Sequence, residues 1–188
     1  MLKLQGENVY LAALERQDCK KICEDNEYDF ANPTEPTLFG WSVENCNEWY
    51  EEIQRLLKEN VNIRVGIFLN DGTVIGDVAL QSIDAWNRAC SIGIGIAKIS
   101  NRGKGYGTEA LGLILGYAFD NIGMERVTAN TLEINMSAQK ALEKLGFMFE
   151  GRARKACYFR GKRYDYLYYS LLAEEWRMNI SNKGAQSR

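Results

Sequence analysis

The segment 102–108, with the sequence Arg-Gly-Lys-Gly-Tyr-Gly-Thr, holds the residues whose spacing points most directly to chemistry. Its three alternating glycines leave backbone N–H groups unobstructed, and the apolar periodicity that follows predicts that a helix begins here. Free N–H groups and the positive dipole end of a helix bind anions, above all phosphate. Arg102 and Lys104 add positive charge. The segment therefore predicts a phosphate site, and the alternative is a turn whose glycines serve tight geometry alone.

Two common nucleotide motifs fit this turn poorly. A P-loop requires a glycine five residues before Gly103, where this chain has Lys98. The dinucleotide pattern is met by Gly105, Gly107 and Ala110. In dinucleotide folds, however, the turn follows its strand directly and an acidic residue closes the next strand, and neither holds here. NAD is retained as an alternative ligand.

The chain contains no histidine, which excludes Ser-His-Asp and Cys-His catalytic units and any histidine-liganded zinc site. Its five cysteines are dispersed and form no Cys-x-x-Cys pair. They are Cys19, Cys23, Cys46, Cys90 and Cys157. An odd, scattered set predicts reduced thiols and no metal centre.

Composition limits the partners and the location. The net charge of −2 and the pI near 5.4 argue against a nucleic-acid partner bound through a broad basic surface, because such binding depends on neutralising phosphates. Residues 1–7 lack the apolar stretch of a signal peptide, and no apolar run approaches the roughly 20 residues that span a membrane. We therefore expect a cytoplasmic, soluble protein with no membrane partner.

The elements that must position the glycine turn follow from periodicity and turn residues. We expect strands at 9–13, 63–69, 74–83, 89–97, 126–132, 147–159 and 164–172. Helices are expected near 16–25, from Ser42 to about Asn60, from the glycine turn to a stop at Gly123, and at 135–145. Ser42 is the predicted N-cap of the second helix, and a proline loop covers 32–37. The order predicts one α/β (α+β) domain over residues 1–180, with a single mixed, mostly antiparallel sheet of about seven strands flanked by helices. Residues 181–188 are expected to be a disordered tail.

Two motifs carry a family resemblance. Arg102-x-x-Gly105-x-Gly107 resembles the pyrophosphate-binding turn of the GCN5-related N-acetyltransferase (GNAT) family. The segment 135–147, which opens on Asn135 and ends Glu-Lys-Leu-Gly-Phe, is similar to a second motif of that family. The order of elements also agrees over nearly the whole chain. The segment 150–165 resembles the branch that contains ribosomal-protein N-terminal and spermidine acetyltransferases.

The resemblance implies acetyl-CoA as co-substrate and an amine as acceptor. The backbone of Gly103, Lys104, Gly105, Tyr106, Gly107 and Thr108 would hold the pyrophosphate, beside Arg102. Gly95, Ile96 and Ala97 would pair with pantetheine like a further strand, and one of their N–H groups could polarise the thioester carbonyl. Asn135 would bind the pantetheine arm. A homodimer is common in this family.

The expected catalytic groups depart from the family pattern. Leu142 stands where many members have a tyrosine acid, and Ser91 where many have a glutamate. Ser137 is the remaining candidate acid, and Glu133 or Asp84 could act as base through water. A helix-start hydrogen bond for Ser137 and solvated charges for the two carboxylates are the alternatives.

The missing base favours an α-amine acceptor, which is neutral in about one molecule in seven at pH 7, against roughly one in 2,500 for a lysine-like amine. Two substrate classes stay open: a peptide or protein N-terminus, and a small amine such as a polyamine or aminoglycoside. Acidic residues between 24 and 29 could attract a polyamine. The lost Tyr and Glu also permit a non-catalytic acyl-CoA-binding module. Tyr164, Tyr166 and Tyr168 are predicted to share one face of the last strand.

Overall fold

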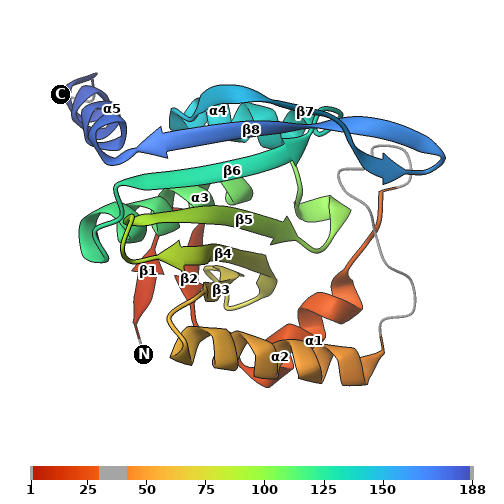
Figure 1. Cartoon of the computed structure of the whole chain (residues 1–188). Coiled ribbons are helices and arrows are strands. Elements are labelled where there is room, and N and C mark those ends of the chain that lie inside the picture. Colours follow the sequence, from red (N-terminus) through yellow and green to blue (C-terminus); the bar gives the residue numbers. More distant parts are fainter. Residues whose placement is uncertain (1, 30–41, 187–188) are drawn as a thin grey trace.

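The computed structural model describes residues 2–29 and 42–186, with side chains described as far as residue 180. Eight strands form one sheet in the order β1-β2-β3-β4-β5-β6-β8-β7, and every neighbouring pair is antiparallel except β5–β6 (Figure 1). The strands are β1 (Lys3–Gln5), β2 (Val9–Ala12), β3 (Ile63–Leu69), β4 (Val74–Asp84), β5 (Ala89–Ile96), β6 (Arg126–Leu132), β7 (Met148–Phe159) and β8 (Lys162–Leu172).

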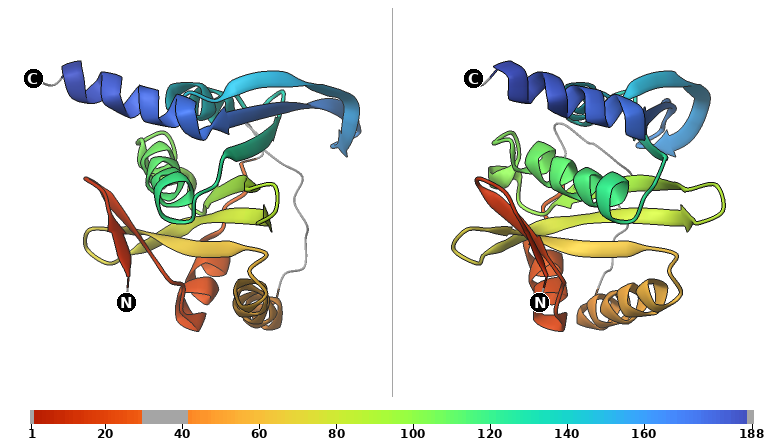
Figure 2. Two further views of the ribbon diagram at one scale, coloured as in Figure 1. Left: turned by 60° about the vertical axis from the view of Figure 1, so that its left-hand side comes forward. Right: turned by 90° about the vertical axis from the view of Figure 1, so that its left-hand side faces the viewer.

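Helices cover both faces of this sheet (Figure 2). On one face, α3 (Tyr106–Gly116), α4 (Met136–Leu145) and the start of α5 (Ala173–Gln186) enclose the main core around Phe119, Ile114 and Leu171. On the other face, α1 (Arg16–Asp25) and α2 (Val43–Lys58) cover a smaller core that joins them to β2, β3 and β4. A π-helical turn at Tyr117–Asn121 extends α3.

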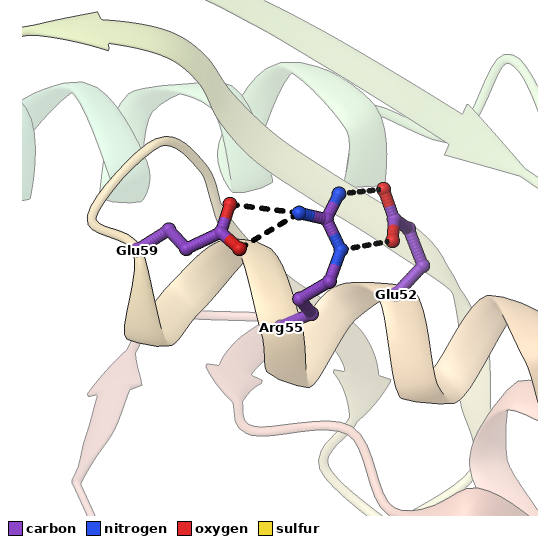
Figure 3. Close-up of polar contacts among 3 residues, drawn as sticks. All are labelled: Glu52, Arg55 and Glu59. Atoms are coloured by element: carbon purple, nitrogen blue, oxygen red, sulfur yellow. Dashed lines mark hydrogen bonds and ion pairs between the residues drawn. The ribbon is translucent and has the colours of Figure 1, made fainter.

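The caps of α2 show why this helix begins and ends where it does. The Ser42 hydroxyl accepts a hydrogen bond from the Asn45 N–H at 3.3 Å, and the Asn45 side chain accepts one from the Ser42 N–H at 2.8 Å. This reciprocal arrangement satisfies two N–H groups that a helix start leaves unpaired. In the last turns, Arg55 bridges Glu52 and Glu59 on the solvent side of the helix (Figure 3). The predicted N-cap is confirmed.

The predicted architecture is confirmed, with local differences. The sheet has eight strands because the short β1 pairs with β2, and a C-terminal helix, α5, was not predicted. The backbone of α5 continues to Gln186, so it includes most of the segment expected to be disordered. Residues 187–188 and the proline loop at 32–37 lie outside the described residues, and the expectation for the tail stays a prediction.

Candidate functional site

The strands β5 and β6 run together for only three residue pairs. Ala89, Cys90 and Ser91 pair with residues 126–128, and beyond Ser91 the two strands separate. The rest of β6 pairs with β8 alone, and the rest of β5 with β4 alone. Within the described sheet, one edge of β5 from Ile92 to Ile96 therefore has no strand beside it. Such an edge binds an extended ligand through backbone hydrogen bonds.

The glycine turn follows this open edge after a short 3₁₀ turn at Ile99–Asn101. Gly103 and Gly105 have φ angles of +74° and +90°, and a Cβ atom built on either would meet nothing within 4 Å. Gly105 is the N-cap of α3. Within the part of the chain that the structure describes, the N–H groups of residues 103–108 donate to no acceptor. The turn therefore presents a row of free N–H groups at the positive end of a helix, as an anion site requires.

The Arg102 side chain was expected to add positive charge to the phosphate site, but it is bound to backbone carbonyl groups. Its guanidinium donates to the carbonyl oxygens of Ile96 at 3.1 Å, Ala97 at 3.3 Å and Glu27 at 2.9 Å. Its own N–H donates to the Ile99 carbonyl. The side chain thus holds the end of β5 and the segment after α1 together and shapes the turn. Lys104 is exposed on the turn, and its side chain has no partner among the residues that the structure describes.

The predicted groups at the start of α4 lie close together in the chain. Asn135 is the N-cap, and its side-chain oxygen accepts from the Ala138 N–H at 3.1 Å. Ser137 is exposed in the first helical turn. The Glu133 carboxylate accepts from the Asp165 N–H at 2.9 Å, so one of its oxygens fastens the connection between β6 and α4 to β8.

Asp84 lies at the opposite end of β5. It pairs with Ala89, and seven residues of strand at about 3.3 Å each separate Ala89 from Ile96, a span of roughly 23 Å. Its carboxylate accepts from the N–H groups of Trp86 and Asn87 and from the Asn87 side chain. These bonds, the Asn87 N–H foremost, lower the pKa of Asp84. Asp84 therefore shapes the β4–β5 turn and does not reach the glycine turn.

The structure adds one acidic residue that sequence reasoning missed. Asp77 pairs in register with Gly95, and its Oδ1 lies 3.4 Å from the position of a Cβ at Gly95. The residue is only 8% exposed, and it forms an ion pair with Arg64. Burial raises the pKa of Asp77, against the lowering effect of the Arg64 charge. The available signal was a single carboxylate inside the apolar run of β4.

Three cysteine thiols, two in α1 and one in β5, are poor nucleophiles. Burial raises the pKa of Cys19 and of Cys23 to about 12 and that of Cys90 to about 11. The thiolate is the reactive form, so an acyl-enzyme on any of the three is disfavoured. Among the described residues, no group of three or more Cys, Asp or Glu could hold a metal ion. No described helix is both long and apolar enough to cross a membrane.

An open strand edge beside a glycine turn at a helix N-terminus can hold an extended ligand that carries phosphate groups. The family model described as acetyltransferase (GNAT) domain matches residues 8–148. The chain therefore belongs to the GNAT family of acetyltransferases, whose members use acetyl-CoA. The predicted family and its enzymatic class are confirmed.

Similar proteins extend over nearly the whole chain. The Bacillus subtilis protein named "Putative ribosomal N-acetyltransferase YdaF" is 30% identical, covering 91% of this chain and 94% of its own length. Mycobacterium smegmatis RimJ in complex with CoA-disulfide shares the fold, with a TM-score of 0.79, 22% identity and coverage of 89% and 83% of the two chains. So does a chimera of Vibrio cholerae spermidine N-acetyltransferase SpeG and hSSAT, with a TM-score of 0.76, 22% identity and coverage of 91% and 99%.

Proposed function

We propose that this acetyltransferase moves the acetyl group of acetyl-CoA to a primary amine, in particular the α-amine of a peptide or protein N-terminus. The observation that carries the proposal is the row of free N–H groups at residues 103–108 beside the open edge of β5. The similarity to YdaF, whose name specifies a ribosomal N-acetyltransferase, supports the N-terminal class.

In this proposal the pyrophosphate lies on the N–H groups from Gly103 to Thr108, and Lys104 adds charge. Pantetheine pairs with β5 at Gly95, Ile96 and Ala97, although the Ala97 N–H already donates to Ile75. Asn135 contacts the arm from the start of α4. Arg102 acts indirectly, by fixing the carbonyl groups that end β5.

The reaction proposed is direct attack, without an acyl-enzyme. Acetyl-CoA supplies the thioester. The amine nitrogen forms a bond to the acetyl carbon while the carbon–sulfur bond breaks, and the proton lost by the amine balances the charge of the departing thiolate. A β5 N–H polarises the carbonyl. Glu133, through water, and Ser137 are the groups near the start of α4 proposed to move the proton, whereas Asp84 lies too far away.

Another function is favoured by a specific observation. Leu142 is buried in the core and Ser91 donates to the Gln81 carbonyl, so neither position supplies the usual acid or base. A non-catalytic acyl-CoA-binding module would require nothing from these positions. It predicts acetyl-CoA binding without thiol release for any amine.

The deciding experiment is a thermal shift with acetyl-CoA and, in parallel, with NADH. A ligand at 100 times its Kd adds about 2.7 kcal/mol, which raises the melting temperature by several degrees. We expect a shift with acetyl-CoA alone, lost in Gly105→Glu. Gly72→Glu is the matched control, because Gly72 has a φ of +89° and equally open space but lies in the β3–β4 turn.

Thiol release in the presence of amines then separates the enzyme from the binding module. Release with peptide N-termini supports the proposal, and binding without release for every amine supports the module. A shift with NADH, or none with millimolar acetyl-CoA, contradicts the proposed site.

A further inference from the structure

The hairpin formed by β7 and β8 carries an unusual concentration of positive charge. Although the whole chain has a net charge of −2, its residues 151–164 contain no acid. Every basic side chain in that stretch is exposed. They are Arg152, Arg154, Lys155, Arg160, Lys162 and Arg163. We call this group the basic hairpin.

A bulge holds part of this charge away from the sheet. Ala153 pairs with Tyr166 and Cys157 with Tyr164, so residues 154–156 stand opposite Asp165 alone. The Asp165 carboxylate accepts from the Lys155 N–H at 2.7 Å and from the Arg152 side chain at 3.1 Å. One acid thus fixes the bulge through the Lys155 backbone and leaves the Lys155 ammonium in solvent.

The apolar side of the hairpin locates it beside the proposed acetyl-CoA site. Phe159 packs edge-on against Tyr28 at 6.4 Å between ring centroids, in a cluster that includes Leu132 at the end of β6. One residue before Tyr28, the Glu27 N–H donates to the Ala97 carbonyl at 3.0 Å. The segment after α1 therefore ties the hairpin to the end of β5, as Figure 1 shows at the right of the molecule.

The charges around this position do not cancel. Arg154, Lys155 and Lys162 have no acidic partner among the residues that the structure describes. Two acids at the end of α1 are paired with lysines: the Asp25 carboxylate lies 2.7 Å from Lys21 and 3.2 Å from Lys98, and the Glu24 carboxylate lies 3.7 Å from Lys20. Glu27 accepts from the Ile99 N–H at 2.7 Å, which fixes its carboxylate and leaves its charge. The basic hairpin therefore keeps positive charge that no described acid pairs with, and lysines balance part of the acidic segment that could have attracted a polyamine.

We propose that the acceptor of this enzyme carries anionic groups, carboxylate or phosphate, a few residues from its reactive amine, and that the basic hairpin binds them. This inference rests on the proposed function and narrows its acceptor class. Opposite charges within a Debye length of about 8 Å favour encounter and binding, and like charges oppose them. A polycation such as spermidine is then a poor acceptor.

The test compares peptides that share an N-terminal Ser-Ala and differ at positions 3–5. These positions are glutamates, phosphoserines, alanines or lysines, and spermidine is a fifth acceptor. We expect kcat/KM for the glutamate or phosphoserine peptide to exceed that for the lysine peptide about tenfold or more at low salt. The difference should lie mainly in KM and should shrink at 0.5 M salt. The relative values for glutamate and phosphoserine distinguish the two anion sources.

The triple variant Arg154→Glu/Lys155→Glu/Lys162→Glu should remove or reverse this preference while its acetyl-CoA thermal shift stays unchanged. Lys3→Glu/Lys58→Glu/Lys144→Glu is the matched control, with the same change of charge on other parts of the surface. We expect it to keep the preference.

Two results overturn the inference while leaving the proposed function standing: equal or better use of the lysine peptide or spermidine, and a preference that survives in the triple variant. If no amine is acetylated although acetyl-CoA binds, the proposed function fails. Fluorescence anisotropy of labelled peptides, measured with CoA present, then tests the inference. The inference requires that the acidic peptide binds more tightly than the lysine peptide and that this difference disappears in the triple variant. A different result would be that an RNA oligonucleotide binds, that this binding is lost in the triple variant, and that no peptide is preferred. It would mean that the basic hairpin binds nucleic acid, and it would refute the inference.

Discussion

At the scale of single residues, Glu109 holds the first turn of α3 in place. Its carboxylate accepts from the Asn8 N–H at 2.8 Å, the Val9 N–H at 3.4 Å and the Asn8 side chain at 3.0 Å. It thereby fastens the helix start that follows the glycine turn to the beginning of β2. Arg102 fastens the other side of the turn. The free N–H groups between them are positioned by two side chains that need not touch the ligand.

We expect Glu109→Ala to lower the free energy of unfolding by about 2 kcal/mol, because it leaves the Asn8 and Val9 donors without their charged acceptor. The melting temperature should fall by roughly 4–8 °C. Glu44→Ala, an exposed first-turn position on α2, is the control and should change little. A loss no larger than that of the control would contradict the role assigned to Glu109.

This contribution should depend on pH. Partial burial alone would raise the pKa of Glu109, but the Asn8 and Val9 donors outweigh it and hold the pKa below its usual value. A lowered pKa in the folded state gives stability that is complete above the unfolded value of about 4.3 and is lost as the pH falls through the folded value. Denaturation curves should therefore show the wild-type advantage over Glu109→Ala at pH 7 and a smaller one below pH 4.

At the scale of elements, Asn135 has two separable functions: it caps α4 and is proposed to contact the pantetheine arm. Asn135→Ala should cost about 1 kcal/mol because the cap is lost. Asn135→Asp keeps a cap oxygen for the Ala138 N–H but removes the amide donor. We expect Asp at this position to preserve the melting temperature and to weaken acetyl-CoA binding, measured by calorimetry. Unchanged affinity would limit Asn135 to the cap.

Elements determined by local signals could be predicted from the sequence. The Ser42 cap and the stop of α4 at Gly146, which has a φ of +93°, depend on residues within one or two turns. The Asn135 cap was not predicted, because the helix-start hydrogen bond was assigned to Ser137. The three-residue β1 could not be predicted, because Lys3 and Gln5 are exposed polar residues and its one apolar residue, Leu4, gives no periodicity; the strand is ordered by pairing with β2 and by the packing of Leu4 on the main core. α5 is anchored by Trp176 on Phe119, at 5.9 Å between ring centroids. That contact joins segments far apart in the chain.

The candidate site divides in the same way. The glycine turn could be recognised because the spacing of its glycines in the sequence is the feature that leaves its N–H groups free to bind an anion. The engagement of Arg102 could not, since one of its acceptors, the Glu27 carbonyl, is 75 residues away. The remoteness of Asp84 and the burial of Asp77 opposite Gly95 follow from the register of β4 and β5, which a single sequence does not specify.

At the scale of the whole molecule, the separation of β5 from β6 predicts a pattern of hydrogen exchange. Beyond Ser91, the N–H groups of β5 that point away from β4 face the open edge. They have no partner strand in the described sheet. We expect them to exchange rapidly in the free protein and to be protected when acetyl-CoA binds, together with residues 103–108. N–H groups in the β3–β4 ladder should not change. Protection confined to the turn would contradict pairing of the ligand with β5.

The three-pair junction between β5 and β6 also bears on how the chain folds. Each of its three pairs joins residues 37 positions apart in the chain, whereas the hairpins β3–β4, β4–β5 and β7–β8 pair strands that are adjacent in sequence. The β2–β3 and β6–β8 pairings also join distant residues. Pairings between distant residues carry the larger loop-closure cost and form late. We therefore expect the three hairpins to form first and the β2–β3, β5–β6 and β6–β8 pairings to follow, and acetyl-CoA to bind only after the β5–β6 junction has formed.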